Sequence, residues 1–219
     1  MNGLESPAGL HELRIAGTPS LAAILGVPTG ARGIVIFAHG SGSGRLSPRN
    51  GYVAARLRKV GLATLLLDLL TPEEELDRRN VFDIALLASR LKRVADWAST
   101  YPETTKLRPC YFGASTGGGA ALRAAAGDPR IAAVVSRGGR PDLAGQDALA
   151  RVRAPTLLIV GELDGVVIEL NAAAQDAMHC RRELVIVPGA GHLFEEPGTL
   201  DQVVELTSEW FLQHLGTRP

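Results

Sequence analysis

The chain carries short, continuous runs of apolar residues, each bounded by glycine or proline, and few folds can accommodate them. Six such runs lie at 33–38, 62–67, 109–112, 131–135, 156–160 and 184–187. They are rich in valine, isoleucine and leucine, and polar residues do not alternate with apolar ones. Strands with this pattern are typically buried on both faces, as in a parallel sheet.

The first part of the chain has a different pattern. Residues 11–16 and 21–25 flank the Gly-Thr-Pro-Ser segment at 17–20, which predicts an antiparallel hairpin at the edge of the sheet. Helical patterns separate the later strands. Strands and helices that alternate in this way predict a doubly wound α/β fold, with a mostly parallel sheet of about eight strands and helices on both faces. We expect one domain over 1–219, without a lid domain.

Three helix starts are predicted. Apolar residues recur every three or four positions over 81–98, which predicts a helix with Asn80 as its N-cap. Thr71 precedes Pro-Glu-Glu-Glu, a typical capped helix start. Thr199 and Gln202 form a capping-box pattern, which opens a final helix. The apolar residues of that helix that we expect to dock on the sheet are Val203, Leu206, Trp210 and Phe211.

Composition excludes several classes of protein. The chain has 219 residues, is 46% hydrophobic, and has 23 basic and 23 acidic residues, so its net charge is zero. This balance gives no field to attract nucleic acid or an acidic membrane surface. Two cysteines, Cys110 and Cys180, are too few for a disulfide framework or a cysteine-ligated metal. The N-terminus lacks the layout of a signal peptide, so we expect a cytoplasmic protein without cofactor, metal, nucleic acid or membrane.

A G-x-S-x-G motif lies directly after the apolar run at 109–112, at residues 113–117. A helix-forming segment follows it. In this strand–turn–helix setting the central Ser115 is held on a strained turn, with its Oγ projecting above the sheet. The N–H groups at the start of the helix can stabilise a developing oxyanion. The alternative is a glycine-rich turn in which Ser115 only caps the helix.

A nucleophilic serine needs a base, and the base needs an orienting carboxylate. Among five histidines, His192 follows the last strand and shares the carboxyl edge of the sheet with Ser115. The segment after the preceding strand supplies Asp164, with Glu162 as the alternative. The order Ser115, Asp164, His192 is that of the α/β architecture with a nucleophile elbow. We therefore predict a Ser-His-Asp triad.

With these motifs the chain resembles an α/β-hydrolase of the dienelactone-hydrolase-like branch, and hydrolase domains sometimes fused to phosphoribosyltransferase domains. The resemblance runs from His39-Gly40 to the closing helix. It implies that Ser115 is the nucleophile, His192 the general base and Asp164 its partner. Dienelactone hydrolases proper carry cysteine at the elbow, so a serine there favours ordinary ester chemistry.

The resemblance also implies an oxyanion hole, made by the backbone N–H groups of Ser41 and Thr116. His39 is expected to brace this loop through hydrogen bonds. The same segment imitates a dinucleotide-binding unit, a strand, glycine-rich turn, helix and strand ending in Asp68. However, Arg45 stands where the third glycine is required. We expect Asp68 to cap a turn or pair with an arginine.

Four arginines follow strand ends near the predicted site: Arg45, Arg49, Arg137 and Arg140. Guanidinium groups there can bind a carboxylate or phosphate of the substrate, and Arg137 and Arg140 are the candidate substrate-binding residues. The alternative is that the arginines form structural ion pairs. The candidate partners are Asp68, Asp142 and Glu196.

Together these features predict a carboxylesterase that acts on a small-molecule ester and is a monomer or homodimer. Two alternatives stay open. The same triad can serve an acyltransferase or a peptidase, which needs a water-excluding pocket or a peptide-binding groove. A binding domain can also keep the fold without catalysis, although an intact triad argues against it.

Overall fold

A computed structural model of the chain describes residues 9–216. Its strands are β1 (Leu10–Ile15), β2 (Leu21–Gly26), β3 (Ile34–Ala38), β4 (Ala63–Leu67), β5 (Pro109–Ala114), β6 (Val134–Arg137), β7 (Thr156–Gly161) and β8 (Arg182–Val187). Its helices are α1 (Pro48–Lys59), α2 (Pro72–Glu75), α3 (Arg78–Val81), α4 (Ile84–Ala98), α5 (Thr116–Ala125), α6 (Gln146–Arg151), α7 (Gly165–Ala177) and α8 (Thr199–Leu215), with a 3₁₀ turn, η1 (Pro141–Ala144).

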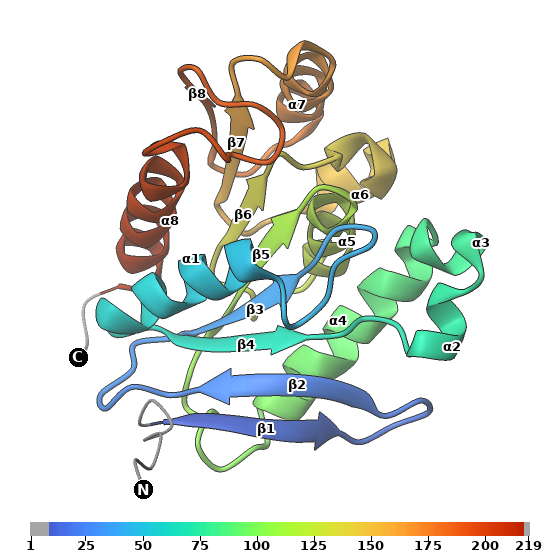
Figure 1. Ribbon diagram of the computed structural model, residues 1–219, viewed down its shortest axis with the longest axis vertical. Coiled ribbons are helices and arrows are strands. Elements are labelled where there is room, and N and C mark those ends of the chain that lie inside the picture. The colour runs from blue at the N-terminus through green and yellow to red at the C-terminus, as the bar shows by residue number, and fades with distance from the viewer. Residues whose placement is uncertain (1–8, 217–219) are drawn as a thin grey trace, which may run out of the picture.

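The strands form one eight-stranded sheet in the order β1-β2-β4-β3-β5-β6-β7-β8 (Figure 1). Strands β3 to β8 pair in parallel. Strands β1 and β2 form the predicted antiparallel hairpin at the edge, and β2 pairs antiparallel with β4. The predicted fold class is therefore confirmed. No helix within residues 9–216 has both the length and the apolar character needed to cross a bilayer.

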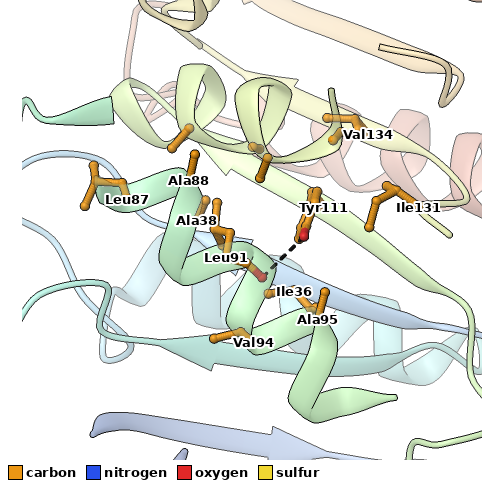
Figure 2. Close-up of a cluster of buried hydrophobic side chains, with 14 of the residues drawn as sticks. Ile36, Ala38, Leu87, Ala88, Leu91, Val94, Ala95, Tyr111, Ile131 and Val134 are labelled. Carbon is orange, nitrogen blue, oxygen red and sulfur yellow. Dashed lines mark hydrogen bonds between the residues drawn. The ribbon is translucent and has the colours of Figure 1, made fainter. Parts of the chain in front are cut away.

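Both faces of the sheet are covered, which explains the continuous apolar runs. Helices α1 and α8 pack on one face, and α4, α5 and α7 on the other (Figure 1). Successive strand residues alternate between the faces. Tyr111 points toward α4, where its hydroxyl donates to Leu91 O at 3.3 Å (Figure 2). Phe112 points to the other face and packs on Phe37, with ring centroids 5.0 Å apart. The α8 residues that are buried there, as predicted, are Val203, Trp210 and Phe211.

Two predicted boundaries in the middle of the chain are wrong. Helix α4 begins after Asp83, whose Oδ1 accepts a hydrogen bond from Leu86 N at 2.9 Å, and Asn80 lies within the separate helix α3. Val81 packs on the same core as α4, so the apolar periodicity continues across the break. Strand β6 begins at Val134 rather than at 131, although the three residues before it are also buried and Ala132 N donates to Pro109 O of β5.

The two predicted capping boxes have different outcomes. Thr71 caps α2 as predicted, since its hydroxyl accepts from Glu74 N and the Glu74 carboxylate accepts from Thr71 N. The prediction of a capping box at Thr199 is wrong. Its hydroxyl donates backward to Glu196 O at 2.8 Å, and the N-cap of α8 is Gly198 at a φ of 80°. Glycine adopts this left-handed conformation without strain.

Candidate active site

Three predicted site residues lie in loops at the carboxyl edge of the sheet. Ser115 follows β5, Asp164 follows β7 and His192 follows β8. Strands β5, β6, β7 and β8 are parallel neighbours, so their carboxyl ends open on the same side. In open α/β sheets this is the edge where ligands bind.

Ser115 lies on a sharp turn between β5 and α5. Its φ of 50° and ψ of −123° belong to a region that L-residues adopt only under strain. The glycines of the motif are needed because backbones approach closely. A Cβ at Gly113 would lie 2.5 Å from Gly117 O, and one at Gly117 would lie 2.1 Å from Ala38 O. The structure thus has the nucleophile-elbow geometry that the motif predicts.

We expect Gly117→Ala to lower the free energy of unfolding by about 3 kcal/mol, because the atom that its Cβ would meet belongs to the backbone of β3. Gly51 in α1 is a matched control, since no atom lies within 4 Å of a Cβ built there. Gly51→Ala should raise the free energy of unfolding by about 0.5 to 1 kcal/mol through helix propensity. Urea unfolding measures both, and equal effects would contradict the packing of the elbow.

The imidazole of His192 is oriented by a carboxylate. Its Nδ1 donates to Asp164 Oδ2 at 2.5 Å, which leaves Nε2 of the neutral ring as the proton acceptor. Asp164 precedes α7, but its side chain makes no capping hydrogen bond there. The alternative carboxylate, Glu162, accepts from Gly189 N at 2.7 Å. The structure therefore pairs His192 with Asp164 and not with Glu162.

Ser115 and His192 line the same cleft, whose volume is about 240 Å³. Other parts of its wall come from Ser41 in the loop after β3 and from Asn50 in α1. Within the described part of the chain, no hydrogen bond joins Ser115 Oγ to the imidazole. Such bonds are often long in enzymes without substrate and tighten when substrate binds.

The loop after β3 is hydrogen-bonded to the turn that carries Ser115. Thr116 is the first residue of α5, and N–H groups in a first turn have no partner within the helix. Ser41 N donates to Thr116 Oγ1 at 3.0 Å. The two predicted oxyanion-hole residues are therefore adjacent, but the threonine hydroxyl accepts the Ser41 N–H in this structure.

Comparison with known proteins agrees with this architecture. Residues 5–206 match the model of the Alpha/beta hydrolase family. The chain belongs to this family. It is 55% identical to a dienelactone hydrolase from Anabaena variabilis ATCC 29413, and the two structures align with a TM-score of 0.91 over 94% of this chain and 98% of the other. Est1E from Butyrivibrio proteoclasticus shares the fold at 19% identity, with a TM-score of 0.79 over 94% and 99% of the two chains.

This dienelactone-hydrolase-like protein also matches part of two longer proteins. Both are from Mycobacterium tuberculosis, strains CDC 1551 / Oshkosh and ATCC 25618 / H37Rv, and each is named "Putative phosphoribosyl transferase". The identity is 62% over 203 residues, which are 92% of this chain and 45% of each relative. The α/β-hydrolase chain thus spans less than half the length of these curated relatives.

His39 braces the loop after β3 of this α/β-hydrolase through hydrogen bonds, as predicted. Its Nε2 accepts a hydrogen bond from Leu69 N at 3.0 Å. The ring proton is therefore on Nδ1, which donates to Gly40 O at 2.9 Å. The side chain is buried, so this pair of bonds fixes the loop to the segment that follows β4.

An ion pair between the buried Arg90 and the partly exposed Glu74 also holds this segment. Arg90 Nη1 donates to Leu69 O at 2.6 Å and to Glu74 Oε2 at 2.7 Å. The hydrogen bonds from Arg90 lower the pKa of Glu74 to about 2. Sequence reasoning identified Glu74 only as part of a helix start and missed Arg90, which lies on the buried side of α4 without a motif around it.

This ion pair should lose its contribution to stability in acid. The pKa of Glu74 in the folded protein lies below its ordinary value of 4.5, so the contribution is complete above that pH and disappears as the pH falls toward 2. We therefore expect the difference in free energy of unfolding between the wild type and Glu74→Gln to shrink across this window. Urea unfolding at several pH values measures it, and a constant difference would contradict the role of the pair.

Three of the four arginines near the cleft of the hydrolase have carboxylate partners: Arg45 with Asp68, Arg49 with Glu195, and Arg140 with Asp142. The predicted pairing of Asp68 is confirmed, and the partner of Arg49 is Glu195 rather than Glu196. Arg140 does not line the cleft, so the structure does not bring this candidate to the site. Arg137 lines the cleft beside Ser115.

The two thiols of the hydrolase have no feature of activated nucleophiles. Cys110 is buried in β5, and this burial raises its pKa to about 12. Burial is also the largest cause that raises the pKa of Cys180. Reactive cysteines instead have lowered pKa values. Within residues 9–216, no cluster of three or more His, Cys, Asp or Glu side chains could hold a metal ion.

Proposed function

We propose that this protein is a serine hydrolase that cleaves carboxylic esters through an acyl-enzyme on Ser115. The observation that carries the proposal is the 2.5 Å hydrogen bond between Asp164 and His192, beside a serine held at positive φ. A base that is oriented by a carboxylate and faces the same cleft as a strained serine is the arrangement that nucleophilic acyl transfer requires.

The reaction proceeds in two steps. Ser115 Oγ attacks the ester carbonyl while Nε2 of His192 takes its proton, and Asp164 keeps the other ring proton on Nδ1. Collapse of the tetrahedral intermediate expels the alcohol, which receives the proton from His192. A water molecule that His192 deprotonates then attacks the acyl-enzyme and regenerates the serine.

The backbone N–H of Thr116 supports the oxyanion of both tetrahedral intermediates, since it lies at the positive end of α5. The N–H of Ser41 is the second donor. It reaches the oxyanion when its hydrogen bond to Thr116 Oγ1 is shared or released. Each such donor is worth roughly 3 kcal/mol in the transition state.

The cleft favours small substrates. A volume of about 240 Å³ accommodates a short acyl group, and Leu193, which is exposed, forms part of its wall. The dienelactone hydrolase with 55% identity supports hydrolase chemistry in this fold. The phosphoribosyl transferase name belongs to proteins that this chain matches over only 45% of their length, and we do not extend that activity to it.

Hydrolysis of p-nitrophenyl acetate, butyrate and octanoate by the purified protein tests the proposal. We expect the two short esters to be cleaved faster than the long one, with an acyl adduct on the peptide that contains Ser115 after acid quenching. Ester turnover by the wild type that is no faster than turnover by Ser115→Ala would refute the proposed activity.

A further inference from the structure

Arg137 is a buried cation in the cleft, and no carboxylate within residues 9–216 pairs with it. Its exposed fraction is 6%, and none of the described residues accepts a hydrogen bond from its Nε. Nη2 has one long contact, 3.4 Å to Asn50 Oδ1. Burial lowers its pKa to about 10, with a smaller effect from the charge of Arg49, so the group still carries its charge at pH 7. A buried charge without a counterion is costly.

The position of Arg137 is fixed next to the nucleophile. It pairs with Ala114 in the register of β5 and β6, and its carbonyl accepts a hydrogen bond from Ser115 N at 3.3 Å. The guanidinium carbon lies 5.7 Å from the centroid of the Phe194 ring. Phe194 is itself held at a positive φ of 56°, close to His192. Arg137 thus lines the same cleft as Ser115 and His192, and its guanidinium reaches Asn50 of α1.

Two further features make the same cleft electropositive. Helix α1 begins at it, since its N-cap Ser47 and its residue Asn50 both line the wall, and its first turn has no acidic residue. The N-terminus of a helix carries a partial positive charge. Arg49 lies at the rim, where its carboxylate partner is the exposed Glu195. Among the described residues, none that lines the cleft is an aspartate or a glutamate. Because the whole chain has zero net charge, this polarity belongs to the site.

We propose that Arg137 binds an oxyanion of the substrate, a carboxylate or a phosphate that the ester carries in addition to its scissile bond. The anion would supply the charge and the hydrogen-bond acceptors that the guanidinium lacks, while the ester carbonyl faces Ser115. This inference rests on the proposed esterase function, and it specifies the class of ester. Guanidinium groups bind both anions bidentately, so the shared chemistry is the oxyanion.

Three matched esters test the proposal: p-nitrophenyl butyrate, mono-p-nitrophenyl glutarate and p-nitrophenyl 4-phosphonobutyrate. We expect the wild type to prefer an anionic ester over the neutral one. The anionic ester that it prefers shows whether the site binds a carboxylate or a phosphate-like group. In Arg137→Gln the ratio of kcat/KM for the anionic ester to that for the neutral one should fall by at least about 30-fold, as expected for lost hydrogen bonds to a charged group. Arg137→Lys, which keeps the charge, should restore part of the ratio.

Arg140→Gln is the matched control, because Arg140 lies three positions along the same segment but pairs with Asp142 outside the cleft. Its ratio should equal that of the wild type. If Arg137→Gln lowers both rates equally, or changes neither, the arginine serves only to pack on Phe194, and the proposal is overturned.

Failure of the esterase proposal can be recognised separately. If the wild type cleaves none of the three esters faster than Ser115→Ala, the proposed function fails, and anion binding is measured directly by calorimetric titration with glutarate and with inorganic phosphate. Binding by the wild type that is lost in Arg137→Gln supports the anion site on its own. Absence of binding to the wild type overturns it.

Discussion

Replacement of Ser115 by alanine is expected to lower kcat for p-nitrophenyl butyrate by roughly 10⁴- to 10⁶-fold, the loss seen when a triad nucleophile is removed. Ser115 provides the oxygen that forms the proposed acyl-enzyme, and without it His192 and Asp164 have no nucleophile to activate. Steady-state hydrolysis at several enzyme concentrations measures the loss. Residual activity above a few per cent of the wild type would place the nucleophile elsewhere.

A second substitution at the same position separates catalysis from folding. Ser115 is held at a φ of 50°, which glycine adopts without strain. Ser115→Gly should therefore raise the free energy of unfolding by about 1 kcal/mol while it abolishes activity. A variant that is inactive and also less stable would mean that the serine supports the fold of the turn.

Asp164→Asn is expected to lower kcat by roughly 10,000-fold, because an amide there favours the wrong tautomer of His192. The asparagine can donate to Nδ1, and the ring proton then moves to Nε2. A protonated Nε2 cannot accept the proton of Ser115. The Asp164 side chain is mostly buried, so water cannot readily take over its role.

Glu162→Gln is the control for this substitution. Glu162 lies in the same loop, but its carboxylate accepts from Gly189 N, and a glutamine oxygen can still do so. Its activity should stay within about twofold of the wild type, as expected for a surface change away from the site. Comparable losses in the two variants would contradict the assignment of Asp164 as the orienting acid.

Much of the fold could be predicted because local signals and long-range order agree in this sequence. Continuous apolar runs require burial on both faces, and parallel strands send their carboxyl ends to one edge. The loops after these runs therefore had to place Ser115, Asp164 and His192 at that edge. The hydrogen bond between the last two confirms that they come together.

Helix boundaries were less predictable because several residues can cap one helix. Asn80 and Asp83 are both good N-cap residues, and only the turn before α4 decides between them. Thr199 fits a capping box, yet its hydroxyl donates to an earlier carbonyl. Periodicity reports which side faces the core and does not locate the first helical residue.

Contacts between side chains that are distant in sequence were not accessible from patterns. Arg137 ends strand β6 and Arg140 lies three residues later, and they have the same chemistry, but one is buried in the cleft and the other pairs with Asp142. The bond from Ser41 N to Thr116 Oγ1 also depends on how two loops meet. Such outcomes follow from packing in three dimensions.

Covalent labelling by a fluorophosphonate probe, read out by intact mass, tests the central claim most directly. The wild type, Ser115→Ala and Asp164→Asn are treated in parallel. We expect one adduct on the wild type, none on Ser115→Ala, and much slower labelling of Asp164→Asn. No adduct on the folded wild type, or an adduct that persists in Ser115→Ala, would contradict an activated nucleophile at Ser115.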